Sequence, residues 1–201
     1  MTKAVGCGIA VVVLLVIFGF LGVGQFNGLV ASEQAVNEAW SQVENTYQRR
    51  ADLIPNLVAT VKGSAEFEQE TLQNVVEARS RVGQVSAQAT EQILNDPQKF
   101  AQYQQAQDGL SSALSRLLVV VERYPELKST AAFSDLMTQL EGTENRITVE
   151  RKRFNEVARD FNTRLQKFPT NIFDRLLGWH FEPRPYFTAQ AGAETAPKVE
   201  F

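Results

Sequence analysis

The strongest pattern in the chain is a row of apolar residues at every seventh position of its second half. The row comprises Phe133, Leu140, Ile147, Phe154, Phe161 and Phe168. Seven residues make about two turns of an α-helix, so these side chains lie on one face of a single helix roughly 50 Å long. Such a helix is stable only when other helices cover its apolar face. The pattern therefore predicts an all-α protein organised around residues 133–168.

A second apolar row precedes the first and advances in steps of three and four residues. It comprises Val36, Trp40, Val43, Tyr47, Ile54, Leu57 and Val61. Arg50 is the one charged residue that falls on this row. Pro55 also lies within it and lacks a backbone donor, so we expect a helix kink near Ala51, whose carbonyl loses its partner. The row resumes in phase beyond the proline, which favours one bent helix over two helices.

Two shorter helical patterns lie between these rows. The first carries apolar residues from Phe67 to about Val85, and the second begins at Asp96-Pro97, where an N-cap residue precedes a proline. Four helices with short connections predict an antiparallel four-helix bundle over residues 27–168. Its two outer helices, the first and the last, are the long ones. They should project together as a stalk at the membrane end.

Antiparallel packing of the two long helices predicts a register. It pairs Val61 with Phe133, Leu57 with Met137, Ile54 with Leu140, Tyr47 with Ile147 and Trp40 with Phe154. The same register sets Arg50 opposite Glu144. We interpret these two residues as a structural polar layer that fixes the register, and the alternative is a polar layer that binds a ligand.

An uncharged stretch runs from Ala4 to Ser32, and its centre reads IAVVVLLVIFGFLGV. About 20 such residues cross a bilayer core, which predicts a short N-terminal tail at residues 1–6 and a transmembrane helix at residues 7–26. Lys3 precedes the span, so the positive-inside rule puts the soluble part outside the cytoplasm. The alternative is a cleaved secretory signal, because Gly22-Val23-Gly24 has the form of a cleavage site.

A short amphipathic segment at residues 169–181 follows the last long helix. Its apolar members are Ile172, Phe173, Leu176, Leu177 and Trp179. They form a possible membrane interface in the headgroup layer, and the alternative is that they pack on the base of the bundle. From Glu182 the chain is rich in proline, alanine, threonine and glycine, which predicts a flexible tail over residues 182–201.

Charged residues alternate along the last long helix. Arg146, Arg151, Lys152 and Arg153 are interleaved with Glu144, Glu150 and Glu156. Spacings of three and four residues are typical of a solvated helix face with local ion pairs. The alternative is a strip that docks anionic lipid or a partner protein.

Composition narrows the possible functions. The 201 residues include 20 Lys and Arg against 23 Asp and Glu, so no basic field favours a nucleic-acid partner. Cys7 is the single cysteine and His180 the single histidine, which argues against a catalytic triad, a Cys-His pair and a histidine-based di-metal site. We expect no catalytic, metal or cofactor site and no small-molecule substrate. An enzyme that uses a carboxylate pair inside the bundle is the remaining alternative.

Three strings of residues resemble signatures of the LemA family. They are Ala39-Trp40 with YQRRADLIPNLV from Tyr47, LEGTENRI from Leu140 with Arg153-Phe154-Asn155, and FNTR from Phe161 with FPTN from Phe168. The resemblance covers residues 28–187. It implies a bacterial protein with one N-terminal membrane helix, an all-α soluble part and no established activity. A magnetosome-membrane protein related to the family points to membrane organisation.

These patterns together predict a membrane-anchored helical scaffold or adaptor without catalytic activity, in the bacterial inner (cytoplasmic) membrane. Its bundle would be presented to an unidentified protein partner or to a second copy. The alternative is a membrane-remodelling or lipid-sensing protein that acts through the membrane-proximal stalk and the amphipathic segment. The resemblance leaves the side of the membrane open, since members of the family have been described with their soluble part in the cytoplasm.

Overall fold

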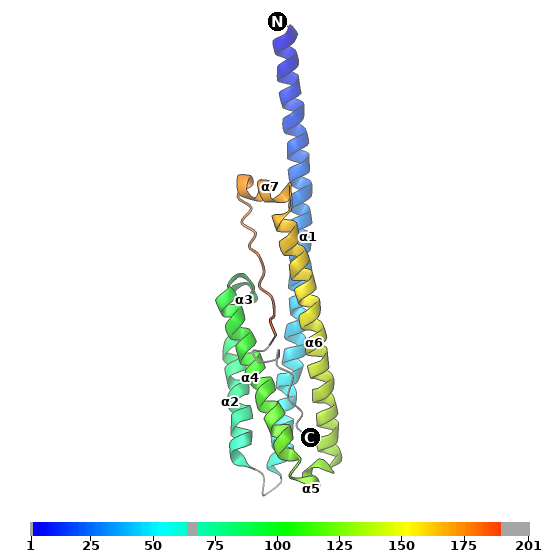
Figure 1. Ribbon diagram of the computed structural model, residues 1–201, viewed down its shortest axis with the longest axis vertical. Helices are drawn as coiled ribbons and strands as arrows, with labels where there is room; N and C mark the ends of the chain where they lie inside the picture. The colour runs from blue at the N-terminus through cyan, green and yellow to red at the C-terminus, as the bar shows by residue number, and fades with distance from the viewer. Residues whose placement is uncertain (1, 64–67, 190–201) are drawn as a thin grey trace, which may run out of the picture.

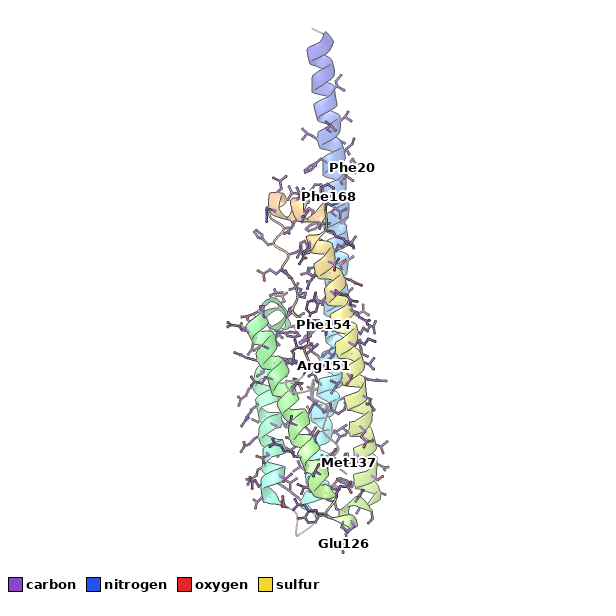
Figure 2. The ribbon with its side chains drawn as sticks, in the orientation of Figure 1. Phe20, Glu126, Met137, Arg151, Phe154 and Phe168 are labelled. Carbon is purple, nitrogen blue, oxygen red and sulfur yellow. The ribbon has the colours of Figure 1, made fainter. Side chains whose placement is uncertain are left out.

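The computed structural model describes residues 2–63 and 68–189, and all regular structure in these ranges is helical. The all-α class is thereby confirmed. The first helix, α1 (Thr2–Lys62), is continuous from the apolar N-terminal stretch to the end of the first apolar row (Figure 1). By length and composition, its apolar part could cross a membrane. The N-terminal portion of that part projects beyond all other helices (Figure 1), and Phe20 is exposed (Figure 2).

Five further helices follow α1 and build the rest of a rod. They are α2 (Gln69–Ser86), α3 (Thr90–Asn95), α4 (Pro97–Val121), α5 (Pro125–Lys128) and α6 (Ala131–Gln166). α6 packs antiparallel along α1, and α2 packs along α4 (Figure 1). Both α1 and α6 extend beyond the other pair toward the N-terminal end. We refer to α1 from Leu29 onward, together with α2 to α6, as the helical body.

Side-chain caps fix where two of the long helices begin. The carboxylate of Asp96 accepts hydrogen bonds from the backbone N–H groups of Gln98 and Lys99, at 2.8 and 3.3 Å. The hydroxyl of Thr130 accepts one from the N–H of Phe133. These contacts satisfy donors that have no partner within the first helical turn.

The apolar core of the helical body consists of two clusters. The cluster nearer the N-terminal end centres on Trp40 and Phe154, whose rings lie 5.4 Å apart, and it includes Phe100 of α4. The far cluster is formed by α1, α2, α4, α5 and α6 around residues such as Leu57 and Leu140. Both clusters draw on the two apolar rows seen in the sequence, because each row supplies the face that its helix buries.

Two details of the long helices differ from the apolar pattern. Phe168 does not continue its row, because α6 ends at Gln166, and the side chain of Phe168 is 79% exposed. Pro55 lies inside α1, and the carbonyl of Ala51 accepts a hydrogen bond from Nε of Arg79 on α2, at 3.0 Å. A neighbouring helix thus supplies a donor to the carbonyl that the proline leaves free.

The chain reverses direction beyond α6. The short helix α7 (Thr170–Leu177) lies across the long axis of the molecule, against α1 (Figure 1). It ends at Gly178, which adopts the left-handed conformation at φ 62°. Residues 179–189 then run back along the helical body without regular structure. Residues 182–189, which we call the tail segment, belong to the region expected to form a flexible tail, and hydrogen bonds join them to the helical body. Residues 190–201 lie outside the described ranges.

Candidate functional site

A polar layer around Arg50 separates the two apolar clusters. The Arg50 side chain has no exposed surface. Its Nη1 atom donates to Oε1 of Glu144 at 2.8 Å and to Oγ of Ser111 at 2.6 Å. Its Nη2 atom donates to Oε1 and to the backbone carbonyl of Gln107, at 2.5 and 3.2 Å. One guanidinium therefore ties α1 to both α4 and α6.

Glu144 is the accessible member of this layer, since its side chain is 38% exposed. It borders a cavity of about 470 Å³ between α4 and α6, with lining residues that include Leu57, Leu114, Met137 and Leu140. Among the side chains that the structure describes, no three of His, Cys, Asp or Glu are grouped so that they could hold a metal ion. The geometry is that of an ion pair between packed helices.

A second polar network lies beside the first. Nε of Arg151 donates to the hydroxyl of Tyr47 at 2.6 Å, and its Nη2 donates to Asp108 at 2.7 Å. The expectation that Arg151 belongs to a solvated face is therefore wrong, because its side chain is only 18% exposed. Burial raises the pKa of Tyr47 to about 12. It also raises the pKa of the adjacent Tyr103, so both hydroxyls stay protonated at an alkaline pH that ionises a free tyrosine.

Asparagine side chains on α6 hold the backbone of the tail segment. Asn162 donates from Nδ2 to the carbonyl of Arg184 and accepts from its N–H, each at 2.8 Å. Asn155 makes the same two bonds to Phe187, again at 2.8 Å. Each side-chain amide thus pairs with one residue as a neighbouring β-strand would. We call these paired contacts amide clamps.

A third amide clamp comes from the opposite helix. Gln104 of α4 donates to the carbonyl of Thr188 at 2.9 Å and accepts from its N–H at 3.2 Å. The tail segment is therefore held from both α4 and α6. Asn155 and Asn162 could have been noticed in the sequence, because they lie seven residues apart, directly after two phenylalanines of the apolar row.

Two side chains of the tail segment enter the helical body. Phe187 is buried against Phe100, with ring centroids 4.8 Å apart, and it stacks on Trp40 at 6.0 Å. Arg184 is buried over the ring of Phe161 and pairs with Glu33 of α1. Figure 2 labels Arg151 and Phe154 at the height where the tail passes, and the Arg151 guanidinium lies 4.9 Å from the centre of the Phe187 ring.

The amphipathic helix α7 is seated on α1. The ring of Phe173 is buried against Phe18, with centroids 4.6 Å apart, and its edge lies beside Gly22. The hydroxyl of Thr170 donates to Gln25 at 2.8 Å, and the Trp179 ring packs edge-on against Phe26 at 5.2 Å. Phe173 and Trp179 of the expected interface set therefore face the protein.

Ile172 and Leu176 of this set face outward, whereas Leu177 lies one turn after Phe173 and borders the same hollow beside Gly22. Ile172, Leu176 and Leu177 are exposed by 48%, 65% and 52%, and Phe168 lies exposed just before the helix. Ile172 and Leu176 therefore give α7 a second apolar surface without a partner among the described residues. Its position beside residues 18–26 of α1 places that surface at the end of the apolar stretch.

Several known proteins are similar to this chain. The Magnetosome protein MamQ 2 of Paramagnetospirillum magneticum is 26% identical over 185 residues, which cover 85% of this chain and 67% of that protein. The Magnetosome protein MamQ of Magnetospirillum gryphiswaldense is 27% identical with the same coverage. Protein LemA of Metamycoplasma hominis is 24% identical over 155 residues, 77% of this chain and 66% of that protein.

A comparison with family models identifies the family of this chain. The model of the LemA family matches residues 39–201, which contain the polar layer, the amide clamps and α7. The three sequence strings that resemble LemA signatures all lie within this range. The chain belongs to the LemA family.

Proposed function

We propose that this protein is a membrane-anchored helical scaffold without catalytic activity, which presents a four-helix bundle to a protein partner or to a second copy. The observation that carries the proposal is the continuity of α1. The helix passes without interruption from its apolar stretch into the core, where Leu29, Trp40 and Val61 are fully buried. A span fused to the central packing element holds the bundle at a fixed height.

The relatives support a role at a membrane. Two of them are named as magnetosome proteins, and the LemA family match together with one apolar helix favours a membrane-associated protein. We place this protein in the bacterial inner membrane with a single span at residues 7–26. Lys3 before the span favours an outward-facing bundle by the positive-inside rule.

Cross-linking in native membranes tests the scaffold proposal. The full chain is treated with a lysine-reactive reagent, and cross-linked peptides are identified by mass spectrometry. We expect links from Lys99 and Lys128 of the helical body to one recurring protein or to a second copy. The same reaction after dilution into mild detergent is the control for chance collisions, because collisions become rare on dilution while a complex with a dissociation constant below the diluted concentration stays assembled. A chain that forms no intermolecular link in either sample would contradict the proposal.

Lipid sensing through α7 is the second candidate, favoured by the outward-facing pair Ile172 and Leu176. A helix of this kind lies in the interface plane with its apolar face about 5–10 Å below the headgroups. Gly22, beside α7, lies about one helical turn inside the end of the predicted span, which agrees with that depth.

Fluorescence quenching tests this second candidate. Trp179 packs beside α7, whereas Trp40 lies roughly 20 Å farther along α1 from Phe26. In nanodiscs with brominated lipid, we expect quenching of Trp179 in a Trp40→Phe chain. A Trp179→Phe chain, which reports Trp40 alone, is the matched control and should stay bright. If brominated lipid lowered the fluorescence of neither chain relative to unbrominated lipid, α7 would not be embedded in lipid.

A further inference from the structure

The contacts of the tail segment are those of a bound peptide. The three amide clamps engage the backbone N–H and carbonyl groups of Arg184, Phe187 and Thr188, and these groups are common to all residues. Proline has no backbone N–H, and none of the amide clamps uses the backbone N–H of residue 183 or 185, where Pro183 and Pro185 lie. Proline also favours an extended chain. The groove therefore recognises an extended backbone first.

Two side chains of the tail segment are buried in the groove, those of Arg184 and Phe187, while the exposed Thr188 adds only a hydroxyl contact to Gln104, at 3.3 Å. The guanidinium of Arg184 reaches Glu33, and the ring of Phe187 fills an aromatic pocket formed by Trp40, Phe100 and Phe154. Tyr186 is 41% exposed and accepts one hydrogen bond, from Asn162. The recognised pattern is thus Arg-x-x-Phe in an extended chain. Backbone pairing with pockets for alternate side chains is a general mode of peptide recognition.

We propose that this groove between α4 and α6 is a binding site for an extended Arg-x-x-Phe peptide, and that a second copy of the chain supplies this peptide by exchanging tail segments. The proposal rests on the scaffold function argued above and gives it a physical contact. The aromatic pocket needs an occupant, because Trp40, Phe100 and Phe154 would otherwise meet water. A neighbouring tail offers the same chemistry as the chain's own tail.

The anchor makes such an exchange geometrically simple. Residues 178–183 are the only covalent link between α7 and the clamped residues, and six extended residues span at most about 20 Å. Copies held by the same span keep their grooves and tails at the same height above the bilayer. A tail that reaches its own groove can therefore enter the groove of a neighbour that stands beside its α7.

A labelled peptide tests whether the groove binds in trans. The probe is EPRPYFTA, the sequence of residues 182–189, added to the full-length chain in detergent. A tethered tail competes at an effective concentration near the millimolar range, so the unmodified chain should bind the probe weakly. In a Phe187→Ala chain the resident tail is weakened and the groove is unchanged. We expect the probe to bind this chain at least about tenfold more tightly.

Matched variants define specificity in the same assay. Replacing phenylalanine by alanine in the probe, or adding Asn155→Leu to the Phe187→Ala chain, should abolish the gain. A rise in the thermal unfolding midpoint of the variant chain with added probe shows that this chain is folded. An Arg184→Ala chain, which keeps Phe187 in the core, provides a second chain with a weakened tail. If the probe bound neither the Phe187→Ala chain nor the Arg184→Ala chain, the proposed binding site would be wrong. The scaffold function could still hold in that case, because the cross-linked oligomers test it separately.

Disulfide trapping tests the identity of the occupant. In a Cys7→Ser background, one chain carries Gln104→Cys and a differently tagged chain carries Thr188→Cys, and the two are co-expressed and oxidised in membranes. We expect a covalent heterodimer. Gln98→Cys, at an exposed position on the same helix, replaces Gln104→Cys in the control and should give none. Equal yields from the two pairs would refute a second copy as the source of the peptide.

Discussion

Arg50 carries a positive charge into a core where its side chain has no exposed surface. Burial of a charge is costly unless hydrogen bonds and an opposite charge compensate it, and here Glu144, Ser111 and Gln107 do so. The two ionic partners are not equivalent, because Glu144 is partly exposed. Loss of the arginine leaves a carboxylate that water can reach, whereas loss of the carboxylate leaves a guanidinium that water cannot reach.

We therefore predict unequal costs for the two single substitutions. Glu144→Leu should lower the free energy of unfolding by about 2–3 kcal/mol, and Arg50→Met by about 1–2 kcal/mol. The loss in free energy of unfolding of the double variant should be smaller than the sum of the two single losses by at least about 1 kcal/mol, as measured by urea unfolding in detergent. Glu141→Leu, at an exposed position on the same helix, is the control. Strictly additive losses would show that the pair does not fix the register.

We predict from the raised pKa values of Tyr47 and Tyr103 that the free energy of unfolding falls in alkaline solution. Their pKa values are higher in the folded chain than in the unfolded chain, so folding favours the protonated hydroxyls. This stabilisation is fully present below pH 10 and is lost as the pH rises from 10 through about 12. At pH 11 the loss from Tyr47 alone should be about 1 kcal/mol. Urea unfolding at pH 9 to 11 measures it, and Tyr47→Phe should flatten the slope.

At the scale of elements, the seat of α7 depends on a glycine in α1. A Cβ atom on Gly22 would lie 3.2 Å from Cε1 of Phe173, whereas one on Gly24 would have no neighbour within 4 Å. Gly22 therefore permits the close approach of the two helices. Gly24, half a turn away, offers a matched position without that contact.

We predict that Gly22→Leu displaces α7 from α1 and that Gly24→Leu does not. A leucine at position 22 needs the volume that Phe173 occupies, and overpacking of this kind forces the partner to move. The emission maximum of Trp179 in a Trp40→Phe chain should shift for Gly22→Leu and stay constant for Gly24→Leu. Identical spectra would mean that α7 is not held by this contact.

The sequence patterns predicted the helices whose buried apolar residues recur at regular intervals. The two apolar rows define α1 and α6, and the Asp96-Pro97 pair marks the start of α4. The register drawn from the rows sets Arg50 opposite Glu144, and the side chains meet in the structure. Both results follow from local periodicity plus one pairing of helices.

The tail segment and Arg151 could not be found in this way. The clamps join residues such as Gln104 and Thr188, which are 84 positions apart, and no periodicity connects them. Arg151 lies beside the apolar row in a charged run, and its inward direction depends on Tyr47 and on Asp108 of another helix. Proline-rich composition also predicts disorder for residues that side-chain amides hold in place.

At the scale of the whole molecule, the protein is a rod in which the apolar N-terminal stretch and the helical body share one helix (Figure 1). We predict that the far end, at α5, stands roughly 50 Å from the membrane surface, because 36 residues of α1 lie beyond Phe26. A donor fluorophore on a Glu126→Cys, Cys7→Ser chain, with acceptor lipids in the bilayer, measures this height. Energy transfer as strong as that of a label next to the bilayer would mean that the rod lies down.

The unbroken passage of α1 through residues 27–33 has a mechanical consequence. A peptide linker there would let the two parts orient independently, whereas a helix transmits every inclination of its buried end to its distal end. A long hydrophobic span adapts to a thinner bilayer by leaning. In the proposed single-span arrangement, a lean of about 10° would carry the tip of an arm of roughly 50 Å sideways by about 9 Å, so that bilayer thickness would set the lateral position of the tip.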